Sequence, residues 1–329
     1  MNFFLLTPNV PNPFTSEKTR NILESYGCIK VSNIAESDCI LAYKYPRLLP
    51  LLLRYPNKRF LVWTNEPRYD TFFKERLKLP LLPTRIEVMN VYGKGVFWNN
   101  LHFLGTYHFM QDNNLGIDIN KPLEKLSIQQ FTEMEKKKKI AAFFSNRLNK
   151  RNKLVKDGRN IDLNDKRCEF ALRGKEANCL DIFGKDWPAG YANENSGFGF
   201  EPEGKPWWLD KLDRLKSYMF NLCPENTAYG YYTTEKIWHS IHAYSLPIYN
   251  GWNSNIYETF PQESFIDFAN FEKPGELFRY ISSLNSREYL ERLNTCIEVY
   301  NASIEVKRKN MDNEAKEMVQ HILQRMDLI

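Results

Sequence analysis

The chain has 329 residues, of which 43% are hydrophobic, so it can bury one large core or two of medium size. Its formal net charge of +5 is small for this length. That charge does not indicate nucleic-acid binding, and no basic stripe with interleaved aromatic residues supports such a role. The charge is compatible with an anionic small ligand.

The six cysteines and the N-terminal residues indicate the cellular compartment of the protein. No two cysteines are three positions apart, which excludes a zinc-ribbon or redox C-x-x-C pattern. We expect them to be reduced and mostly buried. The start, Met1–Pro8, is too short for a signal peptide and lacks a basic flank, and no run of 18 apolar residues occurs. We therefore expect a cytoplasmic protein whose only membrane contact is peripheral, at the inner face.

Short apolar runs alternate with amphipathic stretches in the first third, which favours an α/β fold. We expect helices near Ser16–Tyr26 and Pro46–Leu53. The strands are expected near Phe3–Leu6, Ile29–Val31, Ile40–Tyr43, Phe60–Trp63 and Val88–Val91.

A polar stretch from about Gly116 to Lys139 separates this series from a second one and ends in Glu135-Lys136-Lys137-Lys138-Lys139. We interpret it as a solvated linker or helix end, with a membrane-surface or phosphate-attracting patch as the alternative. The second series predicts strands at Ala141–Phe144, Cys179–Phe183, Met219–Leu222 and Leu246–Tyr249, and helices at Trp207–Tyr218, Thr234–Tyr244 and about Met311–Met326.

Two α/β series joined by a linker predict two Rossmann-like domains facing a cleft, with ligands at the carboxyl ends of the strands. We expect an N-terminal acceptor-binding domain at 1–125, a linker at 126–139, a donor-binding domain at 140–300 and a closing helical tail at 301–329.

The densest chemical signal is the segment Phe220–Lys236, where a buried strand enters a polar loop and then a helix. Thr233 or Thr234 can cap that helix, whose first turn presents backbone N–H groups and a positive dipole end. An anionic phosphate fits there, and Lys236 adds a positive charge.

Three neighbours of Lys236 complete the pattern. An ionised Glu235 accepts hydrogen bonds only, which suits the two hydroxyls of a ribose. Tyr232 and Asn226 can donate to phosphate oxygens. From the residues alone, an ordinary capped helix with a first-turn glutamate remains the alternative.

The segment Phe220–Lys236, followed by Ile237-Trp238 and Leu246–Gly251, resembles the signature of the α-1,3-fucosyltransferases, glycosyltransferase family 10. The resemblance extends over about residues 58–270. It implies a GT-B fold with the acceptor domain first and a GDP-fucose domain second. It also implies that Lys236 and Tyr232 bind the pyrophosphate, Glu235 the ribose, and Asn226 the phosphate side.

Two weaker matches add further donor ligands. Ser145 and Asn146 resemble the strand-end pair that the family places beside the nucleotide. The family then has a diphosphate-binding arginine at a helix start, for which Arg167 is our choice and Arg147 and Arg151 are rivals.

The segment Leu180–Lys185 resembles the family's strand followed by a glycine and a basic residue. Lys185 stands where many members have arginine, so it supplies charge without a bidentate fork. A solvated turn lysine is the alternative interpretation.

The candidate general base is Glu66, which follows the apolar run Phe60–Thr64 and precedes Pro67. A strand-end carboxylate faces the expected cleft, and an ionised glutamate can accept a proton. The family has its proposed base at the matching position. A glutamate that bridges a turn is the alternative. Trp63 and Trp207 are candidate acceptor contacts, although both can also pack in the interior.

We expect no obligatory metal. His239 and His242 lie three apart on a helix but lack a third ligand. No D-x-D occurs at a strand end, because Asp210 and Asp213 belong to a predicted helix. Divalent ions can still stimulate the release of GDP.

The sequence therefore predicts an inverting α-1,3(4)-fucosyltransferase that uses GDP-β-L-fucose. The expected acceptor is an N-acetylglucosamine or glucose unit of an oligosaccharide or glycolipid, as in lipopolysaccharide-type glycan synthesis. The alternatives are a transferase of the same fold for another nucleotide sugar and a non-catalytic glycan- or nucleotide-binding protein.

Overall fold

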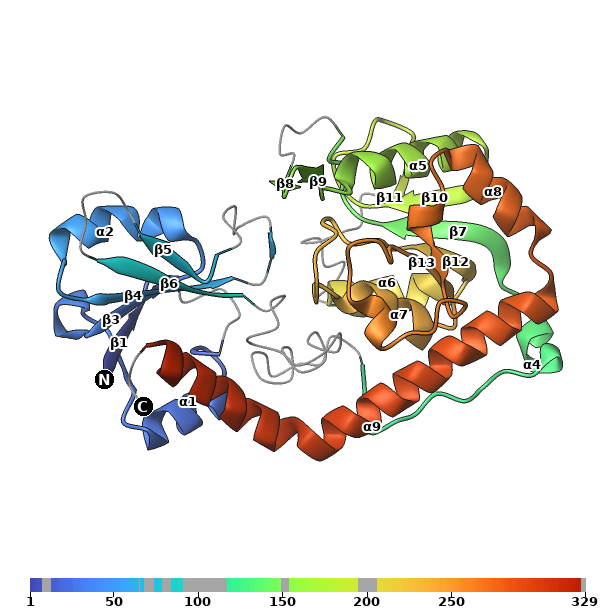
Figure 1. Cartoon of the computed structure of the whole chain (residues 1–329). Coiled ribbons are helices and arrows are strands. Elements are labelled where there is room, and N and C mark those ends of the chain that lie inside the picture. Colours follow the sequence, from blue (N-terminus) through green and yellow to red (C-terminus); the bar gives the residue numbers. More distant parts are fainter. Residues whose placement is uncertain are drawn as a thin grey trace. The chain divides into compact units, whose positions relative to one another are not determined.

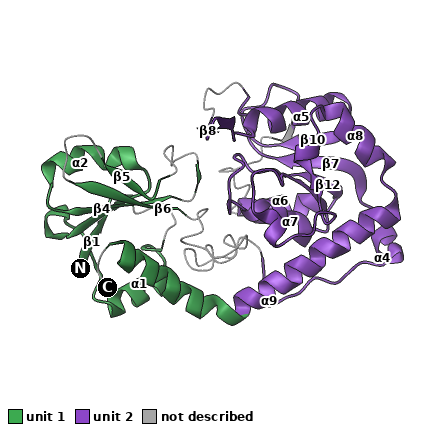
Figure 2. Cartoon of the chain, viewed as in Figure 1, with its two compact units in different colours: residues 1–114, 309–329 green, residues 115–308 purple. Residues whose placement is uncertain are grey.

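The computed structural model forms two compact units. Unit 1 combines residues 1–114 with 309–329, and unit 2 comprises residues 115–308 (Figure 2). The structure describes residues 1–7, 13–64, 66–67, 74–78, 84–90, 117–148, 154–194 and 206–326. The long helix α9, Ser286–Arg325, contributes to both units.

Unit 1 contains a six-stranded sheet in the order β2-β1-β3-β4-β6-β5, in which β5 alone pairs antiparallel (Figure 1). Its described elements are β1 (Asn2–Leu5), α1 (Glu17–Ser25), β2 (Ile29–Val31), η1 (Ile34–Glu36), β3 (Cys39–Ala42), η2 (Tyr45–Arg47), α2 (Leu49–Arg54), β4 (Arg59–Thr64), β5 (Arg76–Lys78) and β6 (Arg85–Asn90). All the elements expected in this part of the chain are present, with ends shifted by a few residues.

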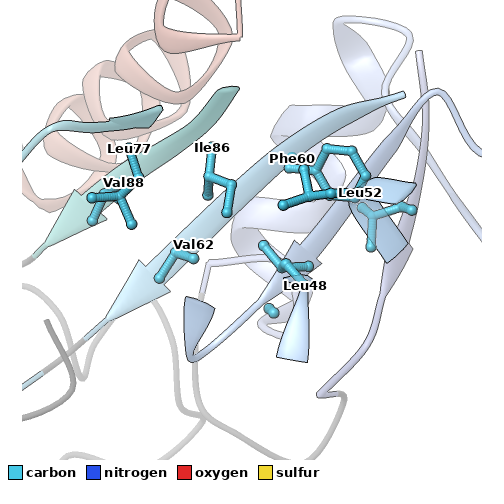
Figure 3. Close-up of a cluster of buried hydrophobic side chains, with 9 residues drawn as sticks. Leu48, Leu52, Phe60, Val62, Leu77, Ile86 and Val88 are labelled. Atoms are coloured by element: carbon cyan, nitrogen blue, oxygen red, sulfur yellow. The ribbon is translucent and has the colours of Figure 1, made fainter. Parts of the chain in front are cut away.

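The central strands β3 and β4 are apolar runs because their part of the sheet is buried, whereas the edge strands β2 and β5 are mostly exposed. On one face, side chains of α2 and of the segment before it pack against β3, β4, β5 and β6 (Figure 3). The cluster consists of Ile40, Ala42, Leu48, Leu52, Phe60, Val62, Leu77, Ile86 and Val88. This packing fixes β4 in the sheet and thereby positions the residues that follow it.

Unit 2 contains a six-stranded, wholly parallel sheet in the order β11-β10-β7-β12-β13-β14. Its described elements are α4 (Ile128–Glu133), β7 (Lys137–Phe143), β8 (Val155–Lys156), β9 (Arg159–Asn160), α5 (Asn164–Glu176), β10 (Leu180–Phe183), β11 (Ala192–Glu194), α6 (Trp207–Leu215), β12 (Tyr218–Leu222), α7 (Glu235–His242), β13 (Leu246–Tyr249), η5 (Ile256–Glu258), β14 (Ile266–Asp267), η6 (Phe268–Asn270), α8 (Pro274–Ser283) and the first part of α9. The strand order is that of a doubly wound Rossmann sheet, whose topological switch lies between β7 and β12.

The lysine run at 136–139 does not close a solvated linker. Lys137, Lys138 and Lys139 begin β7, and Lys136 donates to the backbone carbonyl of Ala243 at 2.9 Å. The Lys139 ammonium donates to Asn178 at 2.9 Å. The basic side chains therefore find partners within unit 2. The segment 126–139 holds α4 and the start of β7.

Two further expectations needed correction. The helix predicted for Trp207–Tyr218 ends at Leu215, and Tyr218 instead begins β12, where its hydroxyl donates to the buried Asp181 at 2.8 Å. The tail does not start a helix near Met311, because α9 is continuous from Ser286.

The two units divide at residues 114/115 and 308/309. No helix in the described part of the chain is long and apolar enough to cross a membrane.

Gly174 allows α5 to approach β10 closely. A Cβ atom at this position would lie 2.7 Å from the Leu180 Cβ and 3.2 Å from the Phe278 ring. The helix therefore tolerates the low helical propensity of glycine because only glycine fits against the strand.

We predict that Gly174→Ala lowers the free energy of unfolding by about 1–3 kcal/mol, because the added methyl group overpacks the contact between α5 and β10. Gly275→Ala in α8 is the matched control, since a Cβ there meets only the Arg279 guanidinium at 3.5 Å. The control should be neutral or stabilising by up to about 1 kcal/mol. Urea unfolding measures both variants, and equal stability of the two would contradict the packing argument.

Candidate active site

The polar residues of the Phe220–Lys236 motif gather where β12 ends and α7 begins, beside the end of β7. In an open parallel sheet this crevice at the topological switch is the usual ligand site. Most side chains of the loop between β12 and α7 are buried, which is unusual for a loop of this polarity. Many of these buried polar groups bond to one another, as the contacts of Glu225 and Asn226 show.

Glu225 organises the start of α7. Its carboxylate accepts hydrogen bonds from the Thr234 backbone N–H at 2.8 Å and from the Tyr249 hydroxyl at 3.1 Å. It also forms an ion pair with the Lys236 ammonium at 2.9 Å. Thr234 is the N-cap residue, as expected, but its side chain does not cap the helix, and its hydroxyl instead bonds to Glu225 at 2.8 Å.

The Glu235 carboxylate lies close to two ammonium groups. Its Oε1 is 3.6 Å from the Nζ of Lys236 and 3.7 Å from the Nζ of Lys211 on α6. Burial by itself would raise the pKa of Glu235, but the positive charges of Lys236, Lys211 and His239 outweigh burial and lower the pKa to about 2. Glu235 is therefore ionised and can only accept hydrogen bonds.

Arg167 at the start of α5 is brought to this cluster. Its side chain is buried, its Nη2 donates to Asn164 at 2.6 Å, and its guanidinium lies 4.7 Å from the centre of the Phe144 ring. Its Nε has no hydrogen-bond partner among the described residues. Burial lowers the pKa of Arg167, Arg147 lowers it further, and Glu225 and Tyr232 partly offset the shift.

The rival arginines differ from Arg167 in position. Arg147 is exposed but close enough to act electrostatically on Arg167. Arg151 lies outside the described residues. The geometry therefore favours Arg167 as the arginine of this cluster.

Asn226 and Tyr232 belong to the same buried network. The Asn226 side-chain N–H donates to the Tyr232 hydroxyl at 3.4 Å, and the Thr227 hydroxyl donates to the side-chain Oδ1 of Asn226 at 2.8 Å. The two predicted phosphate donors thus lie together and next to Arg167.

Ser145 and Asn146 lie at the end of β7, and Lys185 follows β10. The Asn146 N–H donates to the Lys185 carbonyl at 2.8 Å, so these three predicted ligands are neighbours. Gly184 makes this possible. Its φ is +148°, and a Cβ there would lie 2.3 Å from the Phe144 carbonyl oxygen.

Glu66 and Trp63 lie in unit 1. Glu66 follows β4 as predicted, and its backbone N–H donates to the Thr64 hydroxyl at 3.4 Å. Trp63 is only 2% exposed and packs edge-to-face on Phe14, with ring centres 6.3 Å apart. The Trp63 ring therefore belongs to the core of unit 1 in this structure.

Trp207 lies in unit 2, at the start of α6. Its ring is 6.0 Å from the Lys211 ammonium and 6.4 Å from the His239 ring. Trp207 therefore lies beside two of the residues that surround Glu235. The sequence assigned Trp207 to the acceptor, and that role stays a prediction.

The histidines of α7 pack inside unit 2. His239 is fully buried, and burial lowers the pKa of His242, whose ring lies 6.2 Å from that of Tyr300. Among the residues that the structure describes, no three His, Cys, Asp or Glu side chains gather to hold a metal ion. The expectation that no metal is required stays a prediction.

Sequence reasoning missed two members of the cluster. Glu225 stands in the quoted motif beside Asn226, and its charge opposite Lys236 was a usable signal. Lys211 had no such signal, because only the packing of α6 against α7 brings it to Glu235. The cluster therefore contains three cations, Arg167, Lys211 and Lys236, and two carboxylates, Glu225 and Glu235, which leaves one positive charge in excess.

The chain was compared with models of protein families, and the family that matches is consistent with the residues found at this site. The model of the C-terminal domain of glycosyltransferase family 10 (fucosyltransferase) matches residues 134–309, more than half of the chain. The chain belongs to glycosyltransferase family 10. The match contains the whole cluster around Glu225, and the two α/β units with parallel sheets agree with the predicted fold class.

Curated relatives match over a shorter segment. A human 4-galactosyl-N-acetylglucosaminide 3-alpha-L-fucosyltransferase is 34% identical over 76 residues, which are 22% of this chain and 21% of the relative. An alpha-(1,4)-fucosyltransferase of Arabidopsis thaliana is 38% identical over 78 residues, which are 23% of this chain and 19% of the relative. The chain thus spans about a fifth of the length of these relatives in the matched segment.

Two crystal structures are similar at low identity. An alpha1,3-fucosyltransferase with GDP-fucose has a TM-score of 0.46 and 19% identity, covering 89% of this chain and 81% of the other. An alpha1,3-fucosyltransferase structure without a named ligand has a TM-score of 0.49 and 19% identity, covering 95% and 90%.

We predict a pH-dependent contribution of Glu235 to stability. Its pKa in the folded protein is about 2 against an ordinary value of 4.5, so its stabilising effect is fully present above about pH 4.5 and is lost as the pH falls toward 2. The difference in unfolding free energy between the parent protein and Glu235→Gln should be constant near neutral pH and shrink below pH 4.5. Urea unfolding at stepped pH measures it, with Glu24→Gln on the surface as control. A difference that stays level down to pH 3 would exclude a depressed pKa.

Proposed function

We propose that this protein is an inverting fucosyltransferase that transfers L-fucose from GDP-β-L-fucose to a hydroxyl group of a glycan. The observation that carries the proposal is the cluster around Glu225, in which the residues expected to bind a nucleotide diphosphate converge at one helix start. Family membership supports the same chemistry.

The donor would bind with its diphosphate against the start of α7. Lys236, Arg167 and Tyr232 can donate to phosphate oxygens, and the positive end of the helix dipole favours the anion. These groups also stabilise the charge that develops on GDP as it departs. Ser145, Asn146 and Lys185 lie at the neighbouring strand ends, where they can contact the nucleotide, and Asn226 extends the set of donors.

In the proposed mechanism Glu66 of unit 1 acts as the general base. It would take the proton of the acceptor hydroxyl while the oxygen attacks the anomeric carbon of fucose and GDP leaves from the opposite face. A single displacement of this kind converts a β-linked donor into an α-linked product. The two units would have to face each other across a cleft, with Glu66 directed at the bound sugar.

The proposed acceptor is an N-acetylglucosamine or glucose unit linked at O3 or O4. The human relative is named as a 3-alpha-L-fucosyltransferase and the Arabidopsis relative as an alpha-(1,4)-fucosyltransferase, which supports this class of product. An assay with radiolabelled GDP-fucose and a panel of oligosaccharide and glycolipid acceptors identifies it. The same assay with EDTA and with added divalent ions tests the expectation that no metal is required.

The first rival is a transferase for another nucleotide sugar. We predict that GDP and GDP-fucose raise the melting temperature of the protein and that UDP and UDP-sugars do not. A ligand at a concentration a hundredfold above its Kd stabilises the folded protein by about 2.7 kcal/mol. A larger shift with UDP would favour the rival.

The second rival is a non-catalytic binding protein, which the Glu66→Gln variant separates from an enzyme. We predict that this variant lowers fucose transfer about 10²–10⁴-fold, the usual contribution of a general base, while its affinity for GDP stays unchanged. Glu24→Gln, the same change on α1 of unit 1, is the control and should retain full transfer. Undiminished transfer by Glu66→Gln would refute its role, and absence of transfer in the parent protein with every acceptor would favour the binding protein.

A further inference from the structure

Lys211 is a buried charged residue that the proposed mechanism does not use. It is 4% exposed, lies on α6, and its ammonium approaches Glu235 on α7 at 3.7 Å. Glu235 is its only ion-pair partner in the part of the chain that the structure describes. A lysine is seldom so deeply buried unless the surrounding structure uses its charge.

The surroundings of Lys211 restrict what its charge can do. Burial lowers the pKa of Lys211, and the Lys236 ammonium lowers it further, while the carboxylates of Glu235 and Glu225 raise it. The Trp207 ring lies 6.0 Å from the Nζ atom and covers it. The ammonium is therefore directed at a carboxylate.

We propose that Lys211 is a positioning residue that holds the Glu235 carboxylate in place to accept hydrogen bonds from the ribose hydroxyls of the nucleotide. This inference rests on the proposed nucleotide-binding function. It assigns α6 a part in selecting ribonucleotides.

The geometry separates the roles of the two lysines. Lys236 has a second carboxylate partner, Glu225 at 2.9 Å, and lies in the first turn of α7, where the diphosphate is expected. Lys211 lies on another helix, and its Nζ is 3.7 Å from the same Oε1 of Glu235 that Lys236 approaches at 3.6 Å. Two cations from different helices restrict the carboxylate more than one does, so binding of the ribose then requires less reorganisation.

The test compares Lys211→Met with the parent protein for binding of GDP and of 2′,3′-dideoxy-GDP, which lacks the ribose hydroxyls. Isothermal titration calorimetry gives the two Kd values for each protein. The parent protein should prefer GDP by about tenfold or more, which corresponds to about 1.4 kcal/mol. Lys211→Met should lose most of that preference, with the Kd for dideoxy-GDP changed by no more than about threefold, because the diphosphate contacts remain.

Two variants make the result specific to Glu235. In a Glu235→Gln background, Lys211→Met should cause no further loss of preference, because the partner through which it acts is already neutral. Lys216→Met, the same change at the exposed end of α6, is the matched control and should leave both Kd values unchanged.

A loss of folding is distinguished by the conservative change. Lys211→Arg keeps the positive charge and should retain the preference for GDP, and thermal unfolding reports whether each variant is folded. If Lys211→Met does not fold, the preference of Lys211→Arg and its dependence on Glu235 decide the question.

Several outcomes would overturn the proposal. An equal loss of affinity for GDP and dideoxy-GDP would mean that Lys211 serves the diphosphate or the fold. An unchanged preference in Lys211→Met, or no preference in the parent protein, would mean that Lys211 does not act through the ribose.

If the donor is not GDP-fucose, the binding measurements give a different set of results. If the parent protein binds UDP in place of GDP, the donor assignment fails, and the same comparison with UDP and 2′,3′-dideoxy-UDP still tests Lys211. Binding of neither diphosphate would exclude both proposals.

Discussion

The ion pair between Glu225 and Lys236 is the interaction on which the site depends. A carboxylate buried as deeply as that of Glu225 is stable only when further hydrogen bonds satisfy it, and Glu225 receives such bonds from Thr234 and Tyr249. The pair joins the loop after β12 to the start of α7 and to the end of β13. It thereby fixes the ends of these three elements relative to one another.

This arrangement has a chemical consequence for an anionic ligand. The carboxylates keep Lys236 and Lys211 oriented, and Arg167 reaches the same place from α5. The cations are therefore held in place without a ligand, so the proposed binding of a diphosphate would require less reorganisation.

Close approaches between backbone segments position the residues of the site. Gly174 lets α5 lie against β10, which sets the position of Arg167, and Gly184 lets the ends of β7 and β10 meet beside Ser145 and Asn146. A parallel Rossmann sheet brings its strand ends to one edge, so these separate approaches converge on the same crevice.

The sequence by itself determined the α/β class, most elements, and the central motif from Asn226 to Lys236, because apolar periodicity and short-range spacing are local properties. It also placed Glu66 after β4. It could not show that Lys137–Lys139 start a strand, since their partners lie far along the chain. Only the tertiary structure buried Arg167 near Glu225, placed Trp63 in a core and brought Lys211 to Glu235, because each depends on how helices pack against a sheet.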